Sequence, residues 1–88
     1  MIRRRVVVSG RVQGVFFRDT IRRMAASRGV GGWVRNLPDG RMEAVFEGDE
    51  AAVQAMVDFC RQGPRGARVA EADVSDEPAE GLRTFEIR

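Results

Sequence analysis

Residues 5–28 read RVVVSGRVQGVFFRDTIRRMAASR, and this stretch contains the signals of a strand, a loop and a helix in succession. Three consecutive valines followed by Ser-Gly predict a buried strand over 5–11. The loop at 12–18 has a central glycine. Apolar residues then recur at helical spacing over 19–28, where Asp19 is a suitable N-cap and the glycine that follows is a suitable C-terminal stop.

The remainder of the chain continues with further strands and one more helix. The predicted strands cover 31–36, 41–47, 69–74 and 83–87. The second helix follows its N-cap Asp49 and ends at Gly63-Pro64, and the turn of a hairpin lies at 37–40. Alternation over 41–47 predicts one buried and one solvated face. The order β-α-β-β-α-β with a C-terminal strand predicts one α+β domain over 1–88, a ferredoxin-like sandwich whose antiparallel sheet has two helices on one face.

The residue types that are missing exclude several kinds of catalytic site. The 88 residues include no His, no Lys, no Tyr and a single Cys. Without His there is no Ser-His-Asp or Cys-His nucleophile, no His-ligated metal and no imidazole base. Without Lys there is no Schiff base and no P-loop lysine, and one Cys excludes an internal disulfide or a C-x-x-C pair. An enzyme made from this chain would work with Arg, carboxylates, amides, the backbone and water.

Positive charge is concentrated in the first part of the chain. Residues 1–35 contain nine arginines against one acid, whereas residues 36–88 contain six arginines against twelve acids. This asymmetry indicates an anion-binding face in the N-terminal part. Alternatively, most of these arginines are surface charges paired with acidic elements across the fold. The pI of 9.9 adds little, because a chain without His, Lys or Tyr has almost nothing that titrates between mildly acidic pH and about pH 11.

No targeting segment is recognisable at the start of this sequence. The apolar run behind the arginines at 3–5 is three valines long. A signal peptide needs roughly 7–15 apolar residues and a membrane span about 20. We therefore expect a cytoplasmic location and no membrane partner, and we take a monomer as the default.

The loop at 12–18 is a candidate anion site. It lies between a buried strand and a helix start, where unpaired backbone N–H groups and the positive end of the helix dipole favour an anion. Gly14 would allow a tight turn close to a ligand. Arg18 is a cation at the dipole end that disfavours cations, at a cost of roughly a few tenths of a kcal/mol that a bound dianion would relieve. The alternative is an Arg18 side chain in solvent.

Asn36 is a second candidate, and other reactive side chains are assigned to structure. Asn36 ends a predicted strand just before Pro-Asp-Gly, where Asn commonly starts a turn. Its carboxamide oxygen can equally accept a hydrogen bond from a water aimed at a neighbouring ligand. Cys60 falls on the apolar stripe of the second helix, and Trp33 is assigned to packing. The acids at 71–80 follow no metal-ligand spacing.

Two linked signatures in this chain resemble those of the acylphosphatase family. The first is GRVQGVFFR at 10–18, and the second is GWVRN at 32–36 followed by Asp39-Gly40. The similarity continues through Glu47-Gly48 to the Phe-Glu-Ile ending at 85–87. The resemblance implies a ferredoxin-like α/β sandwich that hydrolyses the carboxyl-phosphate anhydride bond of acyl phosphates to carboxylate and phosphate, without a metal or another cofactor.

The resemblance also implies roles for individual residues. The Arg18 position binds the phosphoryl group together with the backbone amides of residues 13–17, and the Asn36 position orients the attacking water. The implied phosphate-binding loop consists of Gln13, Gly14, Val15, Phe16, Phe17 and Arg18. Small acyl phosphates are the expected substrates and inorganic phosphate or sulfate the expected site ligands, with no nucleic acid. Because a chain without His lacks the usual proton acceptor, we hypothesise that the substrate's own phosphate oxygen takes the proton of the water.

Two functions of other classes also fit the sequence. A small basic sheet domain could bind RNA, which the excess of arginine in residues 1–35 favours, although no stacking motif of the type Arg/Lys-Gly-Phe/Tyr lies on a predicted strand. Salt-dependent RNA retention without acyl phosphate hydrolysis would support that function. A non-catalytic anion-binding module would bind phosphate without turnover, even after Asn36→Ala.

Overall fold

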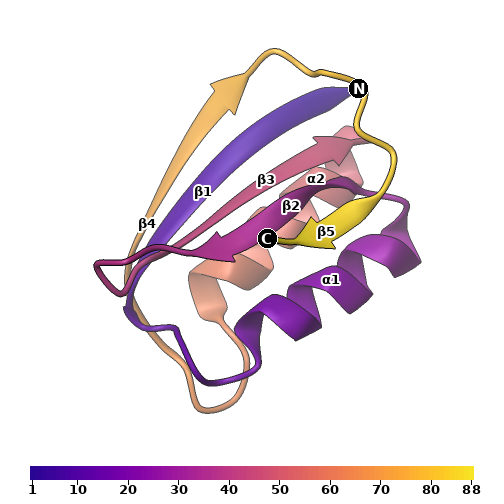
Figure 1. Ribbon diagram of the computed structural model, residues 1–88. Coiled ribbons are helices and arrows are strands. Elements are labelled where there is room, and N and C mark those ends of the chain that lie inside the picture. Colours follow the sequence, from indigo (N-terminus) through magenta and orange to yellow (C-terminus); the bar gives the residue numbers. More distant parts are fainter.

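The strands and helices follow the order that the sequence predicts. The computed structural model describes residues 1–88. Its elements are β1 (Ile2–Arg11), α1 (Phe17–Arg28), β2 (Gly31–Asn36), β3 (Met42–Gly48), α2 (Glu50–Gln62), β4 (Arg68–Glu77) and β5 (Phe85–Ile87). The strands form one sheet in the order β4-β1-β3-β2-β5, and both helices pack on one face of it (Figure 1). The predicted ferredoxin-like α+β fold is confirmed. Neither helix is long and apolar enough to cross a membrane.

The prediction of an antiparallel sheet is wrong for one pair of strands. β2 and β5 are parallel, with Gly32 opposite Phe85 and Val34 opposite Ile87, whereas the other three pairings are antiparallel. β4 ends at the end of the sheet where β2 begins, and the segment 78–84 crosses that end (Figure 1). β5 therefore starts beside the start of β2 and runs in the same direction.

β1 and β4 are both longer than predicted, because charged side chains pair across their ends. The predictions omit the first three residues of β1 and the last three of β4. In the antiparallel register Arg3 lies opposite Glu77 and Arg4 opposite Asp76. Nε of Arg3 donates to Glu77 at 2.9 Å, and Nε of Arg4 donates to Asp76 at 3.1 Å. The arginines at the start of the chain are therefore part of the sheet, as the interpretation of paired surface charge expects.

The hydrophobic core lies between the sheet and the two helices. α2 presents the predicted apolar stripe, and the buried residues of that stripe are Val53, Met56, Val57 and Cys60. Phe17 of α1 and Phe59 of α2 meet edge to face, with ring centroids 5.8 Å apart. Burial of each large apolar side chain contributes roughly 1.5–3 kcal/mol. Because Phe17 is the first residue of α1, this packing fixes where the helix starts relative to the sheet.

β3 is buried on both faces, whereas its alternating pattern predicts one solvated face. Glu43 and Glu47 point away from the helices, yet they are only 9% and 1% exposed. Nη1 of Arg3 donates to Glu47 at 2.8 Å. Arg5 and Arg35 both donate to Glu43. Arginines of the flanking strands thus cover the face that the pattern leaves to solvent.

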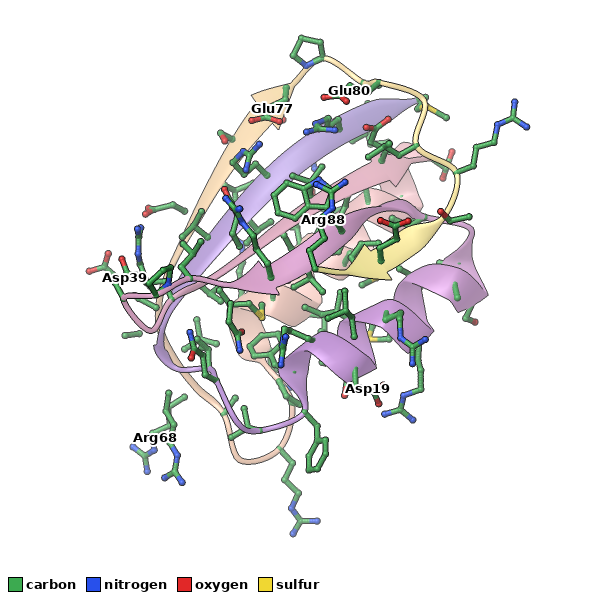
Figure 2. All side chains as sticks on the ribbon, in the orientation of Figure 1. Asp19, Asp39, Arg68, Glu77, Glu80 and Arg88 are labelled. Carbon is green, nitrogen blue, oxygen red and sulfur yellow. The ribbon has the colours of Figure 1, made fainter.

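The same face carries Trp33, which is only 8% exposed. Three guanidinium groups surround its ring, at 5.5 Å for Arg5, 5.3 Å for Arg35 and 4.9 Å for Arg88. Figure 2 shows Arg88 over β2 on this face. Such cation–π contacts contribute about 0.5–1 kcal/mol each. The predicted packing role of Trp33 is confirmed, and this face presents no exposed aromatic ring on which a base could stack.

Candidate active site

The loop between β1 and α1 turns sharply and determines where α1 begins. Gly14 has φ +74° and Phe16 has φ +59°, and Phe16 is the one non-glycine residue with positive φ. Phe16 is the N-cap of α1, so the helix starts at Phe17. The predicted N-cap, Asp19, lies in the first turn instead. An aromatic residue in a left-handed conformation is an uncommon N-cap, which is why residue preferences point to Asp19.

The backbone N–H groups of this loop and of the first helical turn have no acceptors within the protein. None of the N–H groups of residues 13–19 donates to a backbone or side-chain oxygen, and α1 has no side-chain cap. Thr20 is the first residue after this stretch whose N–H donates to an acceptor within the protein, the carbonyl oxygen of Phe16 at 3.1 Å. The hydroxyl of Thr20 donates to the same carbonyl at 2.9 Å. Free N–H groups at the positive end of a helix dipole favour an anion.

Arg18 lies at a pocket of about 350 Å³ next to these N–H groups. The pocket is lined by Val12, Gly14, Phe16, Phe17, Arg18, Asp19, Asn36 and Ile87. Arg18 is half-buried and makes no ion pair, whereas most arginines of residues 1–35 pair with carboxylates. Arg11 and Arg28 are also unpaired, but neither lines the pocket. Arg18 is therefore the free guanidinium of this site.

Asn36 reaches the same pocket from the end of β2. Side chains alternate along a strand, so Asn36 shares the helix-facing side of the sheet with Val34, which is fully buried. Oδ1 of Asn36 is itself buried and accepts no hydrogen bond from the protein. A buried polar atom without a partner costs about 1–3 kcal/mol. A water or ligand that donates to Oδ1 from the pocket would offset that cost.

The turn that follows Asn36 is stabilised by other residues. The carboxylate of Asp39 accepts a hydrogen bond from the N–H of Arg41 at 3.0 Å and another from its Nε at 2.7 Å. The bond from the Arg41 N–H, reinforced by its guanidinium, lowers the pKa of Asp39. The turn at the tip of the hairpin therefore does not use the Asn36 side chain (Figure 2 labels Asp39).

The side chain of Gln13 joins the loop to the β2–β3 hairpin. Its Nε2 donates to the carbonyl oxygen of Leu37 at 2.9 Å and to that of Arg41 at 3.1 Å. Both carbonyls belong to the turn that follows Asn36. The Gln13 side chain thus ties the loop directly to the turn beside Asn36. The prediction includes Gln13 only through its backbone, and nothing in the sequence indicates which carbonyls its side chain binds.

Asp19 brings a carboxylate to the pocket lining, and two arginines of the same helix pair with it. Arg22 approaches Oδ1 of Asp19 at 3.2 Å, and Arg23 approaches Oδ2 at 3.3 Å. Figure 2 shows Asp19 near the start of α1. Exposed pairs of this kind contribute at most about 1 kcal/mol, but they balance the negative charge beside Arg18. No group of three or more His, Cys, Asp or Glu side chains is placed to hold a metal ion.

Two residues of this site are absent from the sequence prediction. Thr20 fixes the carbonyl of Phe16, and a Thr within a helical pattern carries no signal of that contact. Ile87 reaches the pocket because β5 pairs in parallel with β2. Only knowledge of that strand pairing could have placed Ile87 here.

The comparisons with known proteins agree with the signatures at the pocket. The family model described as acylphosphatase matches residues 4–87. The chain belongs to the acylphosphatase family. The predicted family, and the prediction of an enzyme with acylphosphatase activity on small acyl phosphates, are therefore confirmed.

Individual relatives within the acylphosphatase family are similar over nearly the whole chain. The acylphosphatase of Rubrobacter xylanophilus is 61% identical over 85 residues, which are 96% of this chain and 77% of the relative. That of Haloarcula marismortui is 56% identical over 86 residues, 98% of this chain and 94% of the relative. The crystal structure of acylphosphatase from Bacillus subtilis superimposes with a TM-score of 0.94 at 38% identity, covering 100% of this chain and 99% of that one.

Proposed function

We propose that the pocket hydrolyses acyl phosphates through Arg18, the loop N–H groups and Asn36. The observation that carries this proposal is their convergence at one cavity. The cavity is lined by the free guanidinium of Arg18, by residues 14 and 16–19 with their unpaired N–H groups, and by Asn36, whose buried side-chain oxygen has no donor. The phosphoryl oxygens accept hydrogen bonds from the loop N–H groups. The guanidinium of Arg18 binds two of these oxygens in a bidentate manner.

Asn36 positions the water that attacks phosphorus. Oδ1 of Asn36 accepts one hydrogen bond from the water, which leaves a lone pair of the water oxygen directed at the phosphoryl group. The water oxygen forms a bond to phosphorus while the bond from phosphorus to the acyl oxygen breaks, and the carboxylate leaves. The proton of the water moves to a phosphoryl oxygen, so the products are a carboxylate and dihydrogen phosphate.

This division of roles suits a chain without His or Lys. A carboxylate is a good leaving group, so the reaction needs orientation and charge stabilisation more than a strong base. Arg18 and the N–H groups stabilise the charge on the phosphoryl oxygens as the transition state forms. Removal of one such donor typically costs about 10²–10³-fold in rate.

The test is hydrolysis of benzoyl phosphate in the presence of a chelator. We expect turnover by the wild type, and a loss of about 10²–10³-fold in kcat/KM for both Arg18→Ala and Arg18→Lys, because an ammonium group cannot bind two oxygens in the fork geometry. Asn36→Ala lowers kcat by a similar factor but retains inhibition by inorganic phosphate. Arg28→Ala, which removes an unpaired arginine from the far end of α1, leaves the kinetics unchanged.

Each component of the proposal has an outcome that overturns it. Near-normal kcat/KM in Arg18→Lys would reject the bidentate role, and unchanged kcat in Asn36→Ala would reject water positioning. Loss of activity with chelator would reject a metal-independent reaction. Phosphate binding without turnover in both wild type and Asn36→Ala would identify a non-catalytic anion-binding module, and salt-dependent RNA retention without turnover would identify an RNA-binding domain.

A further inference from the structure

The pocket of Arg18 and Asn36 also gathers exposed apolar side chains. Three large hydrophobic residues of the chain are exposed: Met1 at 77%, Phe16 at 82% and Ile87 at 39%. Two of them, Phe16 and Ile87, line this pocket. We propose that Phe16 and Ile87 form an acyl subsite, and that the preferred substrates are acyl phosphates with an apolar aryl or branched alkyl group. This inference rests on the proposed function, which places the phosphoryl group at Arg18.

Strand pairing brings Ile87 to the end of β2 that carries Asn36. Ile87 lies opposite Val34 in the parallel register, and the N–H of Arg88 donates to the carbonyl oxygen of Val34 at 2.8 Å. Phe85, two residues earlier, stacks on Phe46 of the core with ring centroids 5.6 Å apart, so Ile87 points to the same helix-facing side. Past the end of the core, the helix-facing side of the sheet borders the pocket. Ile87 therefore flanks the end of β2 where Asn36 is located.

Phe16 is exposed at a backbone position that does not favour an aromatic residue. Its φ of +59° lies in the left-handed region, which Gly, Asn and Asp adopt more readily. Phe16 is not a member of the hydrophobic core cluster, so its ring contributes little to folding. A ligand that covers the ring would bury apolar surface that the fold leaves in water. Phe16 is thus suited to contact a substrate group that extends from the phosphoryl site.

The size and charge of the pocket favour an apolar acyl group over an anionic one. Its volume of about 350 Å³ is at the low end of the range for small-molecule sites, roughly 300–1,000 Å³. The apolar side chains of Val12 and Phe17 also line the pocket, and both are 1% exposed. The one free cation of the lining, Arg18, is used by the phosphoryl group. A second anionic group on the acyl part would find no free cation in the lining and would lose water against apolar side chains.

The experiment compares benzoyl phosphate with acetyl phosphate in a matched pair of variants at position 87. Ile87→Val and Ile87→Thr have nearly the same shape and differ in polarity. We expect Ile87→Thr to lower the ratio of kcat/KM for benzoyl phosphate to kcat/KM for acetyl phosphate by about fivefold relative to the wild type. The reason is that the Thr hydroxyl loses its water when the benzoyl ring packs against it. We expect Ile87→Val to keep the ratio within about twofold. The inhibition constant for inorganic phosphate should be the same in the two variants.

A second matched pair of variants separates apolar contact by the Phe16 side chain from effects on the left-handed backbone at position 16. Phe16→Leu and Phe16→Asn introduce side chains of similar size, and Asn suits the left-handed conformation better than Leu does. If apolar contact is what matters, the benzoyl-to-acetyl ratio falls more in Phe16→Asn than in Phe16→Leu. If only the loop conformation matters, the benzoyl-to-acetyl ratio of Phe16→Asn is equal to or higher than that of Phe16→Leu. That result rejects the role of Phe16 in the acyl subsite.

Failure of the acyl subsite and failure of the proposed function give different results. A wild type that hydrolyses neither probe overturns the proposed function. A wild type that hydrolyses both, with all four variants at the wild-type ratio, overturns the acyl subsite and leaves the phosphoryl site intact. If Ile87→Thr weakens phosphate inhibition as much as it lowers kcat/KM for benzoyl phosphate, then Ile87 acts through the phosphoryl site, and the acyl subsite is also rejected.

Discussion

The side-chain amide of Gln13 donates a hydrogen bond of 2.9 Å to the carbonyl oxygen of Leu37, and this contact holds two loops together. The same amide donates to the carbonyl oxygen of Arg41 at 3.1 Å. The first loop leads to Arg18, and the second follows Asn36. Gln13 therefore contributes to the spacing between the proposed phosphate-binding and water-binding groups. Rates of reactions between oriented groups depend steeply on such distances.

Gln13→Met should reduce turnover more than phosphate binding. The substitution removes both donors but keeps the length and the neutrality of the side chain. We expect kcat for benzoyl phosphate to fall about tenfold or more, because the water and the phosphoryl group are no longer held in register. The inhibition constant for phosphate should change by less than about threefold, since Arg18 and its neighbouring N–H groups remain.

Gln54→Met is the matched control for Gln13→Met. Gln54 lies on α2 and donates to Asp58 at 2.9 Å, away from the pocket, so its substitution should leave both constants unchanged. An equal loss of kcat and phosphate affinity in Gln13→Met would mean that Gln13 supports only the phosphate loop. An unchanged kcat would mean that the contact does not position the water.

Thr20→Val should weaken phosphate binding through the conformation of Phe16. The Thr20 hydroxyl donates to the Phe16 carbonyl at 2.9 Å, next to the left-handed N-cap. Val keeps the branched shape and removes this bond, so the loop N–H groups lose part of their fixed orientation. We expect the phosphate inhibition constant to rise about threefold to tenfold, a loss of the size of one hydrogen bond. Thr20→Ser should restore binding, and a fall in Tm with no change in the inhibition constant would reveal a purely structural role.

Much of the site was predictable because its signals are local. The glycine at position 14, the position of Arg18 before a helical pattern and the position of Asn36 at a strand end all depend on residues that are adjacent in sequence. The apolar stripe of α2 has a period of 3.6 residues, and its buried face, including Cys60, is the predicted one. The order of strands and helices then restricts the fold to few arrangements.

The remaining features depend on contacts between distant residues. Arg3 and Glu77 are separated by 74 positions, so a run of arginines at the start of the chain does not indicate that they extend β1. Burial of Glu47 depends on that same arginine, and the alternating pattern of β3 points instead to a solvated face. The N-cap at Phe16 follows from the burial of the next residue, Phe17, against Phe59, which overrides the capping preference of Asp19.

The Cys60 thiol should be unreactive in the folded protein. Burial raises the pKa of Cys60 to about 12, so almost no thiolate is present at neutral pH. We expect a disulfide reagent at about pH 8 to modify the native protein at least about 10³-fold more slowly than the protein in guanidinium chloride, because modification requires opening of the core. Cys60→Ala should retain kcat/KM for benzoyl phosphate. Rapid modification of the native protein would show that α2 opens readily from the sheet.

Glu47→Gln should destabilise the protein strongly, because Glu47 anchors the segment that leads to β5. Its buried carboxylate accepts a bond from Arg3 at 2.8 Å, and from the N–H groups of Glu80 at 3.0 Å and Gly81 at 2.9 Å. Figure 2 shows Glu80 at this end of the sheet. Arg3 keeps its ion pair with Glu77, so the expected cost is that of weakening the hydrogen bonds to a buried charge, about 1.5–3 kcal/mol, measurable as the free energy of unfolding in urea. Glu86→Gln, at an exposed glutamate whose contact with Arg88 is 3.9 Å long, should cost less than about 0.5 kcal/mol.

Stability should fall in acid, and Glu47 should account for part of the fall. Hydrogen bonds from Arg5 and Arg3 lower the pKa of Glu77. Burial alone would raise the pKa of Glu47, but the bonds from Arg3 and three backbone N–H groups outweigh it and lower the pKa. The unfolded chain, with an ordinary glutamate pKa of about 4.3, therefore binds protons at a higher pH than the folded protein does.

The free energy of unfolding should consequently be constant from neutral pH to about pH 5 and then decrease as the pH falls through 4.3 toward the lower pKa values of the folded state. Glu47→Gln removes one of these groups, so its stability should decrease less steeply, and its difference from the wild type should shrink with falling pH. Urea unfolding of both proteins between about pH 3 and pH 7 measures this difference. A difference that stays constant over the whole range would mean that the stabilisation by Glu47 does not depend on its charge.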